Sequence, residues 1–226
     1  MTRTIRTALA ATLALATATA AASPLTVTAT VGGGPLAGAT YANFDNVTLG
    51  TAGGTSAGIG IAFAGTGGGA VQGSLGGRYA APYLSNGQGT AFGDSANGLD
   101  TTTYLASGIG SVTLTFAGEE QYLGLLWGSV DTYNTLSFYD GTTLVGSVTG
   151  LNVQANADGN QGATGTYYVN VTSATGFNRV VASSTSFAFE FDNVAYRPMP
   201  SVPEPGALGL LGAGLVATGL VRRRRR

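Results

Sequence analysis

Alternating apolar and polar residues dominate the central part of the chain. Residues 25–31 alternate Leu, Val and Ala with Thr, and residues 112–116 alternate Val, Leu and Phe with Thr. Residues 187–192 carry Phe at every second position. A period of two turns one face of an extended strand toward the core. These segments therefore predict β-strands with one buried face.

Turn residues and further strand-like runs extend this prediction. Residues 136–139 and 142–145 flank Asp140-Gly141, a dipeptide that favours a two-residue hairpin turn. Runs rich in β-branched and aromatic residues follow at 167–171 and 179–183, and no segment between 23 and 200 has a sustained helical period. We therefore expect an all-β domain over residues 23–197, an antiparallel β-sandwich of jelly-roll or lectin-like type.

Two local features qualify the strand pattern. Residues 50–77 contain 12 glycines, yet residues 58–64 still alternate, so we expect strands joined by long connections there. The tetrapeptide Phe-Asp-Asn-Val occurs at 44–47 and again at 191–194. Because these copies lie near the two ends of the domain, we expect them on neighbouring strands with matching pleats.

Both ends of the chain resemble targeting segments. Arg3 and Arg6 precede an apolar stretch that ends in Ala20-Ala21-Ala22, which predicts a signal peptide over residues 1–22 and export. Residues 198–205 hold four prolines and predict an extended linker. The uncharged residues 206–221 predict a transmembrane sorting helix of about 24 Å, short for a hydrocarbon core of about 30 Å.

The closing Arg cluster, residues 222–226, sets the expected orientation. By the positive-inside rule it stays in the cytoplasm, which leaves residues 23–200 outside an inner membrane. A weak, short anchor is typical of a processing signal that is removed. We therefore expect transient anchoring, followed by release to the cell surface or extracellular matrix.

The C-terminal motif resembles a known sorting signal. Val202-Pro203-Glu204-Pro205, the apolar segment and the terminal Arg run together look like a PEP-CTERM signal. The resemblance implies processing by an exosortase in the inner membrane of a bacterium that also makes exopolysaccharide. By this resemblance the processing enzyme recognises the Pro-Glu-Pro residues. Residues 124–141 and 189–196 also look like a family of exosortase-dependent surface proteins, which implies no activity.

Composition excludes much chemistry. The 226 residues contain no Cys and no His, and all ten basic residues are Arg, so His- or Cys-based catalysis, zinc sites with His or Cys ligands and lysine chemistry are impossible. Residues 23–200 hold three Arg against ten Asp and Glu, a net charge of −7. Nucleic-acid binding needs the opposite sign, so nucleic acid is excluded as a partner.

Calcium is the one metal to consider, because it takes oxygen ligands. Asp45 and Asp192 of the two repeated segments are the candidate pair, by analogy with carbohydrate-binding sandwiches that hold a calcium ion between their first and last strands. Residues 156–160 offer an alternative loop, but position 12 of an EF-hand-type loop is Tyr167 instead of an acid. An Asn- and Gly-rich turn explains that loop equally well.

The aromatic residues after 124 have two interpretations. Trp127, Tyr133 and Tyr139 are either core residues or a platform for sugar rings, and burial is the favoured interpretation of the only Trp. In the platform interpretation, Asp131 and Asn134 would hydrogen-bond sugar hydroxyls.

Three functions remain open. The first is a non-catalytic structural protein of the surface or exopolysaccharide matrix. The second is a lectin-like module, with or without calcium. The third is a polysaccharide-active enzyme using two carboxylates, although no pair stands out among the ten acids. We favour the first and expect no catalytic residues.

Overall fold

Strands dominate the computed structural model, which describes residues 24–200. They are β1 Leu25–Thr30, β2 Thr40–Ala42, β3 Gly54–Ser56, β4 Ile59–Thr66, β5 Gly69–Val71, β6 Tyr83–Leu84, β7 Gly98–Leu99, β8 Tyr104–Ala106, β9 Ile109–Gly128, β10 Asn134–Asp140, β11 Thr143–Thr149, β12 Tyr167–Ser184 and β13 Glu190–Pro198. Short helical turns lie at η1 Thr90–Phe92, α1 Gly150–Val153 and η2 Ala163–Gly165. The predicted all-β, antiparallel sandwich is confirmed.

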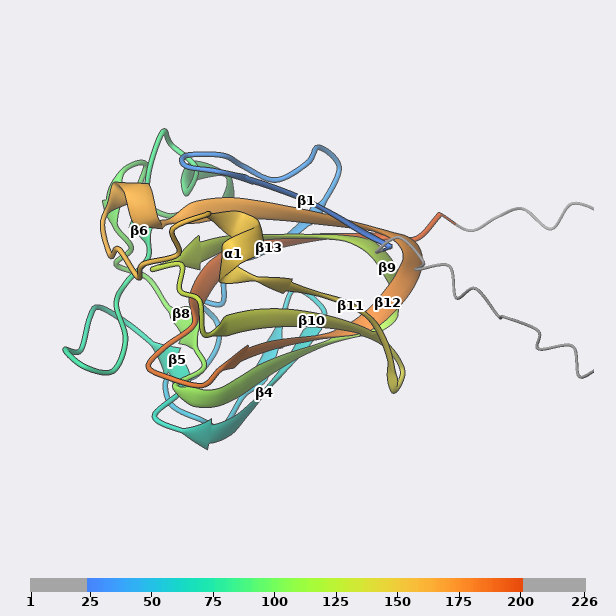
Figure 1. The fold of residues 1–226 in the computed structure, drawn as a ribbon, viewed down its shortest axis with the longest axis horizontal. Coiled ribbons are helices and arrows are strands. Elements are labelled where there is room, and N and C mark those ends of the chain that lie inside the picture. The colour runs from blue at the N-terminus through green and yellow to red at the C-terminus, as the bar shows by residue number, and fades with distance from the viewer. Residues whose placement is uncertain (1–23, 201–226) are drawn as a thin grey trace, which may run out of the picture.

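One continuous sheet of 11 strands folds over to make the two layers (Figure 1). The first layer has the order β11, β10, the end of β12, the start of β9, β4 and β3. The second has the order β1, the start of β12, the end of β9, β13, β8 and β5, with β2 also paired to β13. The strands β9 and β12 therefore belong to both layers.

The pairing of β9 with β12 is interrupted where the sheet folds over. The register shifts between Thr172 and Phe177 and again between Phe177 and Arg179, opposite residues 116–121 of β9. Such irregularities bend strands and increase their twist. We call this end of the sandwich, formed by residues 116–120 and 173–177, the corner end.

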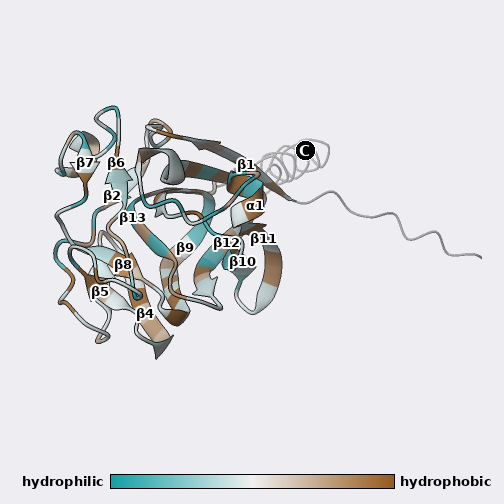
Figure 2. Cartoon of the chain, turned by 60° about the vertical axis from the view of Figure 1, so that its left-hand side comes forward, coloured by the Kyte–Doolittle hydropathy of each residue, from teal (hydrophilic) through white to brown (hydrophobic). Residues whose placement is uncertain are grey.

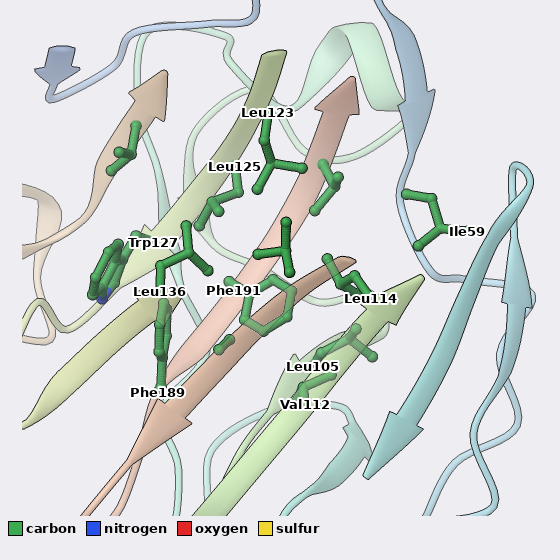
Figure 3. Packing of buried hydrophobic residues seen from close by; sticks show 14 of the residues in the cluster. Ile59, Leu105, Val112, Leu114, Leu123, Leu125, Trp127, Leu136, Phe189 and Phe191 are labelled. Carbon is green, nitrogen blue, oxygen red and sulfur yellow. The ribbon is translucent and has the colours of Figure 1, made fainter. Parts of the chain in front are cut away.

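The space between the layers is filled by side chains from both halves of β9. Leu114 comes from its first half, and Leu125 and Trp127 come from its second half (Figure 3). The Trp127 ring stacks on Phe189 with 4.1 Å between ring centroids. Bands of hydrophobic and hydrophilic residues alternate along the strands, as the period of two requires (Figure 2).

The second layer is buried on its outer face as well. Residues 72–103, which connect β5 to β8 and which we call the covering segment, place Leu84 and Phe92 against Tyr122, Leu126 and Tyr168. At Gly124 between them, a Cβ atom would lie 2.2 Å from the Tyr122 hydroxyl, so the close packing here requires glycine. The second half of β9 is therefore apolar on both faces.

The predicted elements agree with this fold in most places. The hairpin is present, but its two-residue turn is Gly141-Thr142, one residue later than predicted, because Asp140 pairs with Thr143. The glycine-rich region forms β3, β4 and β5, as expected. The alternation over 187–192 overstates the strand, because β13 begins only at Glu190.

The two Phe-Asp-Asn-Val segments do lie near each other. β2 pairs with β13 as far as Ala42 opposite Val194, and the rings of Phe44 and Phe191 are 6.1 Å apart, edge to face. Their pleats do not match, because Phe44 lies beyond the end of β2 with a positive φ of 58°. The predicted neighbouring position is confirmed, and the predicted match of the pleats is wrong.

The predicted targeting segments fall outside the described residues. This applies to the signal peptide 1–22, the Pro-Glu-Pro motif, the helix 206–221 and the Arg cluster. Within residues 24–200, none of the helical turns is long and apolar enough to cross a membrane.

We expect the stacked pair in the core to be a main source of stability. Substituting Phe189→Ala removes the ring that stacks on Trp127, and large-to-small core substitutions of this kind cost about 3–5 kcal/mol. Urea unfolding followed by the fluorescence of the single Trp measures this loss. Leu144→Ala is the control, because Leu144 is 54 % exposed and its loss should change stability by no more than about 0.5 kcal/mol. Equal effects of the two substitutions would contradict the assigned core.

Candidate functional site

The two ends of the described chain leave the sandwich at the corner end. Beside β1, the Ala174 N–H donates a hydrogen bond to the Pro24 carbonyl at 2.8 Å, and after β13 the Met199 N–H donates to the Glu119 carbonyl at 2.8 Å. The opposite end, which we call the loop end, holds the end of β9, the start of β13 and the adjoining loops (Figure 1). Candidate binding features gather toward the loop end.

The loop end carries a pocket with a volume of about 120 Å³. Its walls are residues 74–79 of the covering segment together with Gln161, Phe187, Ala188 and Glu190. The Arg78 guanidinium lies 4.9 Å from the centroid of the Phe187 ring, so one cation and one aromatic face border the opening. The pocket is smaller than those that enclose drug-sized ligands, which measure about 300–1,000 Å³.

Glu190 provides the pocket's one carboxylate. Its side chain is 2 % exposed, and one carboxylate oxygen accepts a 2.8 Å hydrogen bond from the Ala80 N–H, while the other has no partner. Burial, with a smaller contribution from the charge of Asp131, raises the pKa of Glu190 to about 7. Glycoside hydrolysis needs two carboxylates about 5–10 Å apart, and Asp131 is not part of the pocket lining.

A second polar group lies between β13 and the covering segment, and we call it the acidic cluster: Asp94, Asp100, Asp192 and Asn193. Asp192 is 0 % exposed, and burial followed by the charge of Asp100 raises its pKa well above the usual range. Burial also raises the pKa of Asp94 to about 6, with the charges of Asp100 and Asp45 adding to the effect and Asn193 opposing it. The carboxylates of the acidic cluster therefore share one buried region.

The predicted calcium pair is only partly brought together. Asp45 is exposed at the rim, where its two oxygens accept hydrogen bonds from the Thr103 N–H at 3.1 Å and the Asn43 amide at 2.8 Å. Asp192 interacts instead with Asp100 and Asp94 of the covering segment. No three Asp or Glu side chains within residues 24–200 already form a group that could hold a metal ion.

The alternative loop at 156–160 forms a turn whose carboxylate is satisfied locally, while its backbone is bridged to Val130 and Asp131. The Asp158 carboxylate accepts hydrogen bonds from the Asn156 amide at 3.3 Å and from the Asn160 N–H at 3.3 Å. Both oxygens are thus engaged within the loop, as in an Asx-type turn.

The described residues form no aromatic platform, and the favoured interpretation of Trp127 as a core residue agrees with its complete burial. Asn134 is completely buried as well: Trp127 fills the space between the layers, and the Asn134 amide donates to the Ala188 carbonyl while its oxygen accepts from the Ser184 hydroxyl. Asp131 is also buried. Tyr133 and Tyr139 are half-buried, and they lie apart, because the Tyr133 hydroxyl bonds the Phe187 carbonyl and the Tyr139 ring packs under Arg179.

Asp94, Asp100, Arg78 and Glu190 were not predicted as site residues. Their position depends on how the covering segment folds over the second layer, and no local pattern encodes that placement. The repeated tetrapeptide was the one available signal, since it contains both Asp192 and Asn193.

Comparison with known families bears on the C-terminal segment alone. A family model for the PEP-CTERM protein-sorting motif matches residues 201–226. This confirms the predicted sorting signal, which marks an exosortase-dependent protein exported to the cell surface. A search of curated proteins gives no match.

The ionisation of Glu190 should make stability depend on pH. Folding raises its pKa from 4.5 to about 7, so the folded protein binds this proton more tightly than the unfolded chain does. The resulting stabilisation is complete below about pH 4.5 and is lost as the pH rises through about 7. Glu190→Gln keeps an oxygen acceptor for the Ala80 N–H and cannot ionise, so its free energy of unfolding should fall less than that of the wild type between about pH 5 and pH 8.

Urea denaturation across this pH range measures the difference. Asp140→Asn is the control, because Asp140 is exposed beside the hairpin turn and its loss should leave the wild-type slope unchanged. An unchanged slope in Glu190→Gln would assign the titration to another group.

Proposed function

We propose that the exported chain is a non-catalytic structural protein of the cell surface or of the exopolysaccharide matrix. The observation that carries this proposal is the position of the chain ends. Both leave from the corner end, so the segment leading to the sorting motif starts there and the loop end faces away from it. A domain attached in this way presents its loops to the surroundings.

The strand arrangement suits a structural role. β9 and β12 are hydrogen-bonded to each other through both layers, and β1 and β13 are paired along their length to these same strands. The terminal strands are therefore held to the two longest strands in the fold. A pull on the C-terminal end acts on β13, which is flanked by β9 on one side and by β2 and β8 on the other.

The sorting step is tested by changing the motif. Replacing Pro203, Glu204 and Pro205 together by Ala should keep the protein out of the surface fraction of the native host, because the processing enzyme no longer recognises it. Fractionation and intact mass measure this, and the processed wild type should lack residues 222–226. Met199→Ala, which lies just before the matched segment 201–226, is the control and should leave sorting unchanged. Normal surface delivery of the triple variant would contradict the proposal.

The non-catalytic role is tested in a strain that lacks the protein. Its exopolysaccharide should keep the wild-type chain length while the cohesion of the matrix falls. A changed chain-length distribution would instead support the enzyme hypothesis.

Carbohydrate binding at the loop-end pocket is a second candidate function. The supporting observation is the combination of Arg78, Tyr79, Phe187 and Glu190 around one opening. Aromatic faces can stack on sugar rings, the carboxylate can accept hydrogen bonds from hydroxyls, and a guanidinium forms paired hydrogen bonds with a carboxylate. The pocket volume suits the edge of one acidic sugar residue in a longer chain.

A glycan array with the purified full-length chain tests this candidate. Arg78→Ala should weaken binding of acidic glycans at least about tenfold, since a hydrogen bond to a charged group contributes about 1.5–3 kcal/mol. Arg179→Ala is the matched control, because Arg179 also packs on an aromatic ring but lies beside the hairpin turn. An equal loss in both variants, or no bound glycan, would contradict binding at this pocket.

A further inference from the structure

The acidic cluster contains oxygen atoms that are buried and unpaired. Neither carboxylate oxygen of Asp192 makes a hydrogen bond, and the same holds for both buried oxygens of Asp94. Asp100 uses one oxygen to accept hydrogen bonds from the N–H and hydroxyl of Thr102, and its other oxygen has no partner. Leaving a charged group buried and unpaired is among the costliest arrangements in a folded protein.

The neighbouring amide makes no hydrogen bond of normal geometry either. Asn193 is almost completely buried, and its side chain lies close enough to Asp94 to lower the pKa of that carboxyl group. Asp192 and Asn193 are consecutive, and in a regular strand their side chains would point to opposite faces. The strand is irregular between Asp192 and Ala195, however, and Asn193 has a φ of 51°. Both side chains therefore interact with Asp94: Asn193 lowers the pKa of Asp94, and the charge of Asp94 raises the pKa of Asp192. The irregularity thus turns an amide and a carboxylate toward the same place.

The arginines of the domain do not neutralise this cluster. Arg78 lies over the Phe187 ring, Arg179 over Tyr139 and Arg197 over Tyr122, and these three are the only basic residues between 24 and 200. No arginine contributes to the pKa shifts of Asp94 or Asp192. The charge of the acidic cluster is therefore neutralised either by protons, which the raised pKa values of Asp94 and Asp192 favour, or by a bound cation.

We propose that the acidic cluster binds a calcium ion between β13 and the covering segment, with Asp100 and Asp192 as its central ligands and Asp94 and the Asn193 amide oxygen beside them. Calcium takes six to eight oxygen ligands and accepts amide, backbone and water oxygens together with carboxylates. It therefore does not need three carboxylates already gathered at one point, and no such group is formed within residues 24–200. Magnesium demands stricter octahedral geometry and keeps its water shell, so it suits this flexible set less well.

Calcium titration of the purified full-length chain tests the proposal. Thermal unfolding is compared in calcium, in magnesium and in chelator. At a hundredfold excess over Kd, which is about 10⁻⁴–10⁻³ M for extracellular calcium modules, calcium should raise the melting temperature by roughly 5–11 °C. Terbium, which substitutes for calcium, should give luminescence sensitised by Tyr104 and Tyr168, which both interact with Asp192.

Matched variants locate the ion. Asp192→Asn and Asp94→Asn should each remove most of the calcium shift and the terbium signal, while Asp158→Asn in the 156–160 turn should keep both. Asp94 is only half-buried, so its variant tests the site even if Asp192→Asn fails to fold. No shift in the wild type, an equal shift with magnesium, or an equal loss in Asp158→Asn would overturn the proposal.

Discussion

The pairing of β9 with β12 through the corner end is the constraint on which the rest of the fold depends. Each strand supplies a segment to both layers, so the layers cannot separate without breaking the two longest strands. It also fixes the register of every neighbour: β4 follows the first half of β9, β13 follows its second half, and β1 and β10 follow the two halves of β12. The inner core follows from this register, since alternate residues of both halves face each other.

The same pairing explains why polar groups become buried. The second half of β9 is apolar on both faces, so its outer face needs cover, and the covering segment provides it with Leu84 and Phe92. β13 runs beside β9, so the outward residues Glu190 and Asp192 pass under the same cover. Burial raises the pKa of both carboxyl groups, and the covering segment adds Asp94 and Asp100 to the same region.

The sequence was informative where a local pattern decides the structure. The period of two located β1 and the core of β9, and the Asp-Gly dipeptide located the hairpin to within one residue. It failed where distant segments meet. Trp127 was a candidate for both core and surface, because a strand buried on both faces leaves no alternation to distinguish them. Asp94 and Asp100 lie in a segment with two two-residue strands and one short turn, so no pattern places them over β13.

Few interactions attach the covering segment to the sheet. Its own strands β6 and β7 pair only with each other, so backbone pairing does not bind it to the second layer. What holds it are apolar contacts and single hydrogen bonds, such as those from the Ala80 N–H to Glu190 and from the Tyr83 N–H to the Thr166 hydroxyl. The chain has no cysteine, so a disulfide cannot add to these contacts. An ion held jointly by Asp100 and Asp192 would join the covering segment to β13 and would neutralise the carboxylates whose burial the fold imposes.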